Sequence, residues 1–498
     1  MQASCHLQNF RMQEPLHEVD AFYLPPFPTL DPFLMVQSHG TNPSGRSTDE
    51  QKVTWEPVTP STISFSSTGS PMSQQDSHSC QADSSPTSGH SLTDDGSDLK
   101  LKLMELENEM LGPDPDTVGI LEMGKRRRKS MDMLPRDGLQ KILIACARAV
   151  SDCDVLAAEA LRHELCQRVS VRGEPIERLG AYVSEALAAR YKGTTIVQKP
   201  NFHMHALFEA CPYYKFGCMA ANGAIAEAMK DETQVHIIDI QISQVTQWII
   251  LIRAFASRPG GPPHIRITGT YDPTLSGSIA SIVSTAKAKL LEEARLVRVP
   301  LEFQAVAMSG SKVLAEQLRV RPHEALAVNF AFVLHRLSDE SVDTRNHRDR
   351  LLRLAKSLSP RVVTLVEQEA NMNTAPFLPR FLEMLDYYKA VFESLDTSLG
   401  QDDQARIGIE QHCLARDIMN IVACEGGQRV ERHELHGKWR SRFSMAGFAP
   451  RPLNSYMNHA IGEILHQNYS HKYRIKEVDG VLYLGWMNRN LVTACAWR

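Results

Sequence analysis

The chain has 498 residues, of which 43% are hydrophobic and 22% charged, and its formal net charge is −4. This length supports a sizeable buried core. The charge balance excludes a general binder of polyanions, so any contact with DNA or RNA requires a local basic patch. The ten cysteines form no CxxC pair, which indicates reduced thiols in the cytosol or nucleus. No apolar run approaches the roughly 18 residues of a membrane span.

Residues 1–134 are predicted to form a disordered regulatory arm. Within it, residues 38–98 are rich in serine, proline, glycine and acidic residues, and such a segment cannot bury enough apolar surface to offset its conformational entropy. Short hydrophobic clusters at 22–24 and 33–35 have two interpretations: more of the same coil, or short motifs that become ordered on a partner.

Two segments of the arm differ from this background. Apolar residues at steps of three and four predict an amphipathic helix over 99–111, which is marginal in isolation and is expected to dock on its own domain or on a partner. A basic run follows, composed of Lys125, Arg126, Arg127, Arg128 and Lys129. Five consecutive cations on a linker suit the acidic groove of a nuclear import receptor, and the alternative is a solvated run of charge.

Residues 135–498 are predicted to form one domain with a helical cap over about 139–230 and an α/β core over about 235–498. In the predicted cap, hydrophobic residues recur throughout with the period of an α-helix. Strand-like runs follow at 235–240, 264–269, 301–306, 325–332 and 361–367, with connections long enough for crossover helices, which predicts a parallel sheet. Residues 473–478 and 481–486 flank Asp479-Gly480, a strong hairpin turn, and 491–497 can add a further antiparallel strand. This Rossmann-like layout, a mostly parallel sheet that ends in an antiparallel hairpin, is that of class I methyltransferases.

The turn after the first predicted strand is where a nucleotide-type cofactor would bind. It contains no glycine between Asp239 and Trp248, although close approach of a ligand to the backbone requires one. Asp239 is therefore interpreted as a helix N-cap or as the partner of a nearby backbone amide. His433 and His436 lack the spacing of a zinc pair, and no GxSxG turn is present. We expect no catalytic residue, no cofactor and no metal ligand.

Several short motifs, in order along the chain, resemble those of the GRAS family of plant transcriptional regulators. The motifs are VHIID (Val235, His236, Ile237, Ile238 and Asp239), Arg416-Asp417 within a 376–417 stretch that matches the PFYRE region, RVER (Arg429, Val430, Glu431 and Arg432), Trp439 with Gly447, and the C-terminal Trp486 and Trp497. The resemblance covers residues 139–498. The helix at 99–111, the stretch 212–225 and the LHRL run 334–337 most resemble scarecrow-like proteins of the phytochrome-A-signalling branch. Val245, Asp417 and Cys495 depart from the usual glycine, glutamate and serine.

Each motif also has a structural interpretation. VHIID reads as a buried parallel strand. The two arginines of RVER bracket Glu431, which favours an internal ion-pair network over a ligand clamp. Trp486 and Trp497 are expected to pack against one another or against the adjacent helix.

The resemblance implies a nuclear transcriptional regulator, with the cytoplasm as a second location. We expect it to act mainly as a coregulator that binds transcription factors or other nuclear proteins, without a membrane, and a homodimer or heterodimer of GRAS-type domains is compatible with this role. Direct sequence-specific DNA binding is the alternative, and an S-adenosylmethionine-dependent methyltransferase is a weaker one because the glycine turn is missing.

Overall fold

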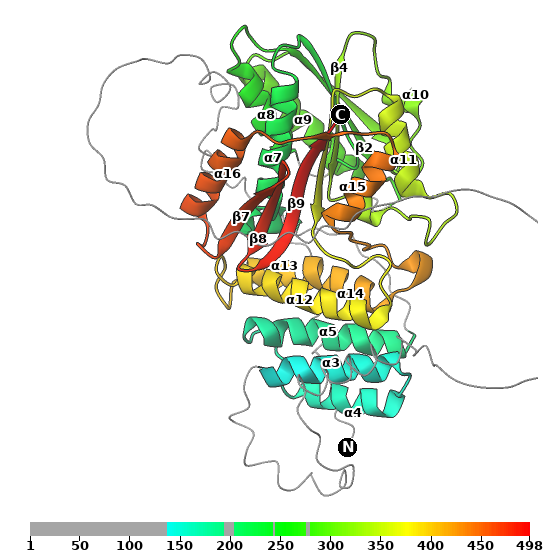
Figure 1. Cartoon of the computed structure of the whole chain (residues 1–498). Coiled ribbons are helices and arrows are strands. Elements are labelled where there is room, and N and C mark those ends of the chain that lie inside the picture. The colour runs from blue at the N-terminus through cyan, green and yellow to red at the C-terminus, as the bar shows by residue number, and fades with distance from the viewer. Residues whose placement is uncertain (1–136, 194–203, 243–244, 275–278) are drawn as a thin grey trace, which may run out of the picture. The chain divides into compact units, whose positions relative to one another are not determined.

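The computed structural model describes residues 137–193, 204–242, 245–274 and 279–498. They form a nine-stranded sheet covered by helices, with a further group of helices beside it (Figure 1). The helices before and between the first strands are α3 (Asp137–Ser151), α4 (Val155–Cys166), α5 (Pro175–Tyr191), α6 (Met204–Ala210), α7 (Pro212–Ala228), α8 (Thr246–Ala256), α9 (Ile279–Leu296), α10 (Ala315–Leu318), η4 (Leu334–Arg336) and α11 (His347–Ser357). The later helices are α12 (Phe377–Leu395), α13 (Gln404–Ile409), the π-helical η5 (Glu410–Leu414), α14 (Ala415–Ala423), η6 (Gly426–Gln428), α15 (His436–Met445) and α16 (Ser455–Asn468).

The sheet has the strand order β3-β2-β1-β4-β5-β9-β8-β7. Its strands are β1 (Gln234–Asp239), β2 (His264–Tyr271), β3 (Leu301–Ala307), β4 (Ala325–Ala331), β5 (Val362–Gln368), the short β6 (Pro450–Arg451), β7 (Tyr473–Val478), β8 (Val481–Trp486) and β9 (Arg489–Trp497). Strands β1 to β5 are parallel, and β9 runs antiparallel between β5 and β8. The predicted methyltransferase-like sheet with an antiparallel C-terminal end is confirmed.

Side chains along each strand alternate between the two faces of the sheet, and this produces two separate hydrophobic cores, one on each face. In β1, Val235 and Ile237 belong to the core beneath α7 and α8, whereas Ile238 belongs to the core beneath α11 and α15. The same alternation holds in β4, where Ala327 and Val328 lie in opposite cores. Successive side chains of a strand point to opposite faces, so a strand without polar interruption must be covered on both sides.

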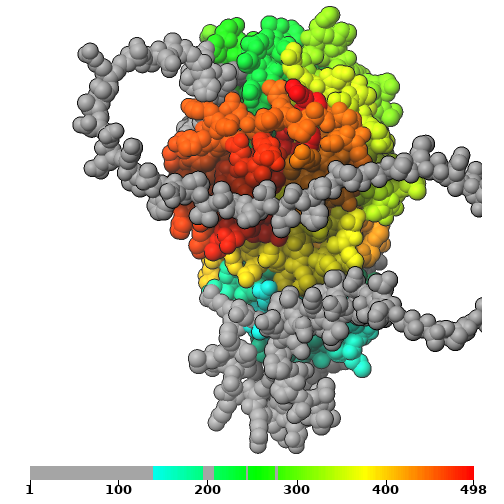
Figure 2. Space-filling model, viewed as in Figure 1, coloured from blue at the N-terminus to red at the C-terminus, as the bar shows by residue number. Residues whose placement is uncertain are grey.

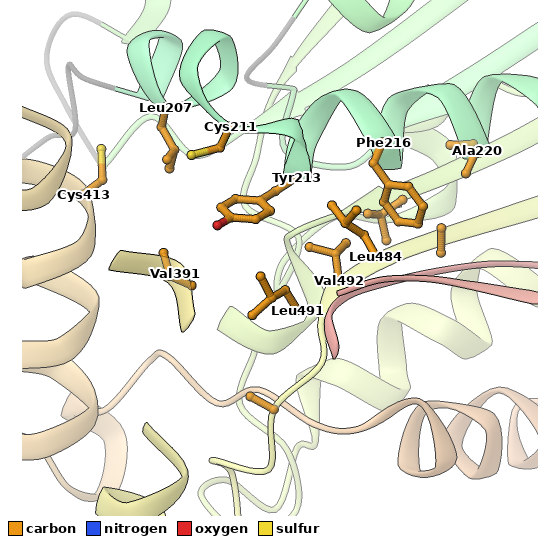
Figure 3. Packing of buried hydrophobic residues seen from close by; sticks show 14 of the residues in the cluster. Leu207, Cys211, Tyr213, Phe216, Ala220, Val391, Cys413, Leu484, Leu491 and Val492 are labelled. Carbon is orange, nitrogen blue, oxygen red and sulfur yellow. The ribbon is translucent and has the colours of Figure 1, made fainter. Parts of the chain in front are cut away.

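Helix α7 shows how closely the first core is packed. Phe216 points toward Leu484 and Val492 of the C-terminal strands, whereas Tyr213 extends to the side of Val391 of α12 (Figure 3). A Cβ atom at Gly217 would overlap with the Val366 side chain, so glycine allows the helix to lie against β5. Helix α7 therefore covers the sheet, although the sequence placed it in the helical cap.

The helices beside the sheet come from two distant parts of the chain. Helix α5 packs against α3 and α4, and also against α12 and α14. Figure 2 shows the yellow residues of the later helices between the cyan residues of α3–α5 and the orange and red C-terminal residues. The first half of the chain thus supplies three of these helices and residues 377–423 supply the others.

The C-terminal hairpin turns at Asp479 and Gly480, with φ values of 53° and 74°. Two consecutive positive φ values are typical of a type I′ turn, whose twist matches that of the two strands it joins. The turn predicted from the sequence is confirmed. Among the described residues, no helix is both long and apolar enough to span a bilayer.

Candidate functional site

The carboxyl end of β1 is where a methyltransferase-like fold would hold its cofactor. Asp239 lies there, buried, and accepts hydrogen bonds from Trp248 Nε1 at 2.9 Å and from Asn329 Nδ2 at 3.0 Å. Burial raises the pKa of Asp239 to about 6, against the opposing effect of these two donors. Its predicted role as a helix cap is wrong, because Val245 occupies the N-cap position of α8. Among the described residues, its donors are side chains and not a backbone amide.

The turn that follows β1 folds over the neighbouring strand. Gln241 has a φ of 64°, and the next residue, Ile242, donates its backbone N–H to Thr270 O at 2.8 Å. The Ile242 side chain is buried against β2, where its Cγ2 lies 2.7 Å from the place of a Cβ at Gly269. The chain's own aliphatic group therefore occupies the surface that a ligand would approach above β2.

The remaining VHIID residues serve the sheet. Val235, Ile237 and Ile238 are each 1% exposed. His236 is held between Thr268 Oγ1, 2.8 Å from its Nε2, and Arg266 Nη2, 2.9 Å from its Nδ1. Burial, reinforced by the Arg266 charge, lowers the pKa of His236 to about 4, so the ring is neutral at physiological pH.

Three motifs that are distant in sequence meet in a second buried site. Glu431 Oε1 accepts hydrogen bonds from Arg336 Nε at 3.0 Å and Nη2 at 2.7 Å, and Glu431 Oε2 lies 3.1 Å from His335 Nε2. His335 Nδ1 lies 2.6 Å from Glu367 Oε2. The LHRL run, the RVER motif and the end of β5 thus share one network.

The charged groups of this network shift one another's pKa values. Burial alone would raise the pKa of Glu431, but Arg336 and His335 hold it well below its usual value. Burial alone would lower the pKa of His335, but the carboxylates of Glu367 and Glu431 raise it to about 9. Each charge is therefore stabilised by its neighbours rather than by water.

Arg416 and Asp417, at the start of α14, adjoin the same network. Arg416 Nε lies 3.8 Å from Asp417 Oδ1. Burial, followed by repulsion from Glu431, raises the pKa of Asp417 to about 7. The sequence grouped these two residues with a different motif from Glu431, and the fold brings them together.

The arginines of RVER do not pair with the glutamate between them. Arg429 donates to the backbone carbonyls of Met372 and Asn373, both at 2.8 Å, and Arg432 Nε donates to Arg429 O at 2.8 Å. Val430 N donates to Asn420 Oδ1 at 2.8 Å. An ion-pair network exists, but its cations are Arg336 and His335. Backbone carbonyl groups hold the two arginines instead, and Arg429 Nε also lies 3.6 Å from Glu425 Oε2.

The tryptophans of the C-terminal motifs lie on opposite faces of the sheet. Trp486 packs edge-on against Tyr473, with 4.9 Å between ring centroids, and Trp497 stacks on Phe443 of α15 at 4.7 Å. The prediction that they contact one another is wrong, whereas contact of Trp497 with the adjacent helix is confirmed. Trp439 is fully buried with the Arg348 guanidinium 5.0 Å from its ring, and Gly447 ends α15 with a φ of 89°.

Sequence reasoning missed His335, Arg336, Glu367 and His433 as members of one site. His433 was weighed only with His436, yet its ring stacks on that of His335 with centroids 4.5 Å apart. The LHRL run was the available signal, because it places a histidine and an arginine directly after a buried strand. The basic run Lys125–Lys129 and the predicted helix 99–111 lie outside the described residues.

The strand order and the helices on both faces define a methyltransferase-like sheet that has been joined to a helical cap. The sequence profile of the GRAS domain family matches residues 139–498, and the chain belongs to this family. It is 53% identical over 439 residues to the Scarecrow-like transcription factor PAT1 of Arabidopsis thaliana, covering 83% of this chain and 89% of that protein. This match confirms the resemblance to scarecrow-like proteins of the phytochrome-A-signalling branch.

Two further similarities agree with this assignment. The chain is 51% identical over 459 residues to the chitin-inducible gibberellin-responsive protein 2 of Oryza sativa subsp. japonica, covering 88% of this chain and 84% of that protein. The crystal structure of SCL7 from Oryza sativa matches with a TM-score of 0.65 and 34% identity, covering 72% of this chain and 99% of that one.

Proposed function

We propose that this chain is a nuclear regulator of transcription in plants that acts mainly as a protein-binding coregulator, recruited by factors already bound to DNA. Membership of the GRAS family and similarity to a scarecrow-like transcription factor support the regulatory class. The observation that favours binding over catalysis is the position of Ile242, which packs on β2 at the edge where a methyltransferase would hold its cofactor.

The state of Asp239 supports the same conclusion. It is buried, and each of its carboxylate oxygens already accepts a hydrogen bond from the chain's own side chains, one from Trp248 and the other from Asn329. Titration calorimetry of the purified full chain with S-adenosylmethionine should therefore show no binding heat. Micromolar binding that is lost in Asp239→Ala would overturn the non-enzymatic role.

The helical cap offers a surface for a protein partner. Leu156 and Val155, at the start of α4, are 86% and 53% exposed. Large apolar side chains exposed side by side at a helix end favour contact with another protein, either a transcription factor or a second GRAS-type domain. The arm of residues 1–134 would carry regulation, and its basic run would direct import into the nucleus.

A matched pair of variants tests this surface. Leu156→Glu should abolish co-precipitation of the partner factor without lowering the melting temperature, since the side chain is exposed. Leu296→Glu introduces the same charge at a position that is 61% exposed on α9, and it should leave the interaction unchanged. Equal binding by both variants would exclude α4 as the contact.

Direct DNA binding is the second candidate function. At a net charge of −4 the chain lacks the phosphate attraction that supplies most non-specific DNA affinity. In a mobility-shift titration at about 150 mM salt, the full chain alone should not shift promoter DNA, but it should supershift a complex of that DNA with a partner factor. A sequence-specific shift by the chain alone at nanomolar concentration would overturn the coregulator proposal.

A further inference from the structure

Three buried side chains converge between the turn after β4 and the segment after α14. His335, Glu431 and His433 each offer one ligand atom, and these atoms all lie within 4.8 Å of one another. Glu431 Oε2 lies 3.1 Å from His335 Nε2 and 3.7 Å from His433 Nε2. The carboxylate oxygen therefore stands between two imidazole nitrogens.

His433 is the unexplained member of this group. Its side chain is fully buried, and neither Nδ1 nor Nε2 has a hydrogen-bond partner among the described residues. Buried polar groups are almost always hydrogen-bonded, because burial without a partner costs free energy. Its ring lies nearly parallel to that of His335, with an interplanar angle of 21°. An internal ion pair between His335 and Glu431 accounts for those two residues but not for His433.

The groups around this cluster orient it. Glu367 Oε2 binds His335 Nδ1 at 2.6 Å, while Glu367 Oε1 accepts the backbone N–H groups of Leu334 and His335 at 2.8 and 3.2 Å. This carboxylate fixes the His335 ring so that Nε2 points at Glu431. Arg336 holds the other oxygen of Glu431 and leaves Oε2 directed at the histidines. Carboxylates that orient a histidine from behind are typical of metal sites.

We propose that His335, Glu431 and His433 bind a divalent transition-metal ion of the zinc class. Two imidazoles and one carboxylate are a usual ligand set for zinc, with metal–ligand distances of about 2.0–2.2 Å. Two ligands of one ion can therefore lie up to about 4 Å apart, and the separations of 3.1 and 3.7 Å fall within this limit. A small rotation of the His433 ring brings the third ligand into range.

The ion would join two segments that are distant in sequence. His335 follows β4, whereas Glu431 and His433 follow α14 and lead into α15. Zinc binds neutral imidazole, so it would replace a proton shared between His335 and Glu431, while His335 keeps its Nδ1–H bond to Glu367. The site would stabilise the fold, and it is independent of the proposed coregulator role.

Metal content and affinity test the proposal directly. The purified full chain, stripped with a chelator and then exposed to Zn²⁺, should retain about one ion per chain by mass spectrometry of the metal and show binding by calorimetry. His433→Gln should weaken this binding by more than about 100-fold, and Glu367→Gln by about 10–100-fold. His436→Gln is the matched control, because His436 is also buried with its Nε2 unpaired but lies outside the cluster.

The ten cysteines of the chain are the competing ligands. Co²⁺ distinguishes them, because the proposed site should give visible d–d bands without the near-ultraviolet charge-transfer band of a thiolate. This measurement uses the unaltered chain and does not depend on a variant that folds. A thiolate band, equal zinc affinity in His433→Gln and His436→Gln, or no zinc retained by the unaltered chain would each overturn the proposal.

Discussion

Arg178 in α5 donates a hydrogen bond from Nε to Glu410 Oε1 at 3.0 Å, although 232 residues separate the two in sequence. Both side chains are at most 1% exposed. The other oxygen of Glu410 accepts from Arg406 Nη1 at 2.7 Å, and this arginine is fully buried as well. One carboxylate, placed at the start of the π-helical turn η5, therefore connects the N-terminal helices to the helices of the second half of the chain.

Replacing Glu410 with alanine should destabilise the fold strongly. The change leaves Arg178 and Arg406 buried without their shared carboxylate, and breaking a buried pair in this way costs about 3–5 kcal/mol of unfolding free energy. Urea denaturation of the full chain measures the loss. Glu292→Ala, which removes an exposed ion pair with Arg295, should leave stability nearly unchanged, because solvent screens such a pair. A similar small effect in Glu410→Ala would mean that the buried cluster does not hold the helices together.

Asp239→Asn should alter how stability depends on pH. The pKa of Asp239 is raised from its usual 3.8 to about 6 in the folded state, so between these values the folded chain binds more protons than the unfolded chain. Stability contributed by this carboxyl group therefore falls as pH rises through this window and stays low above it. The asparagine variant lacks this loss, and its unfolding free energy relative to the unaltered chain should rise by about 2 kcal/mol between pH 4 and 7.

The comparison of the two proteins at each pH cancels all other titrating groups. Asp402→Asn, at an exposed position, should track the unaltered chain across the range. A constant difference between Asp239→Asn and the unaltered chain would mean that Asp239 ionises in the fold at its ordinary pKa.

Trp497→Ala should cost about 3–5 kcal/mol, which is typical when a fully buried large aromatic side chain is removed. Trp497 is 1% exposed and stacks on Phe443, and its strand β9 lies inside the sheet between β5 and β8. Met487→Ala, at a position that is 51% exposed in the turn before β9, should be nearly neutral.

Deleting 481–498 removes β8 and β9 together and uncovers the edge of β5, so the product should lack cooperative melting. A soluble truncation with an unchanged melting temperature would make these strands a detachable tail.

The sequence carried enough information for the sheet but not for the contacts across it. Alternation in β1, long connections between strands, and the Asp479-Gly480 turn are local patterns, and each predicted its element. The faces of Trp486 and Trp497 were not predictable, because they depend on which residues of β8 and β9 pair: Leu482 lies opposite Ala494. Trp486 shares the face of Leu482, whereas Trp497 lies on the face opposite to Ala494.

The buried histidine cluster shows the same limit more strongly. His335 and His433 are separated by the whole of β5 and α11–α14, so no spacing rule connects them. Asp239 was examined only for local roles, yet its partners are a side chain on α8 and another on β4. Long-range polar contacts depend on strand order, and strand order follows from the fold rather than from a short motif.

Replacing Lys125, Arg126, Arg127, Arg128 and Lys129 with alanine should shift a fluorescent fusion of the full chain from the nucleus toward the cytoplasm. Import receptors recognise such runs through several charge-assisted contacts, which alanine cannot make. The control replaces the five residues 114–118 of the same arm with alanine, which alters an equal length of chain without removing cations, and it should remain nuclear. Melting curves of all three proteins should coincide, because every change lies outside the domain matched at 139–498.

If the basic-run variant is as nuclear as the control, the run is a solvated stretch of charge, and the chain enters the nucleus with a partner or through another signal. Restoring import to the variant with an appended import signal would show that its cytoplasmic location came from lost import and not from retention.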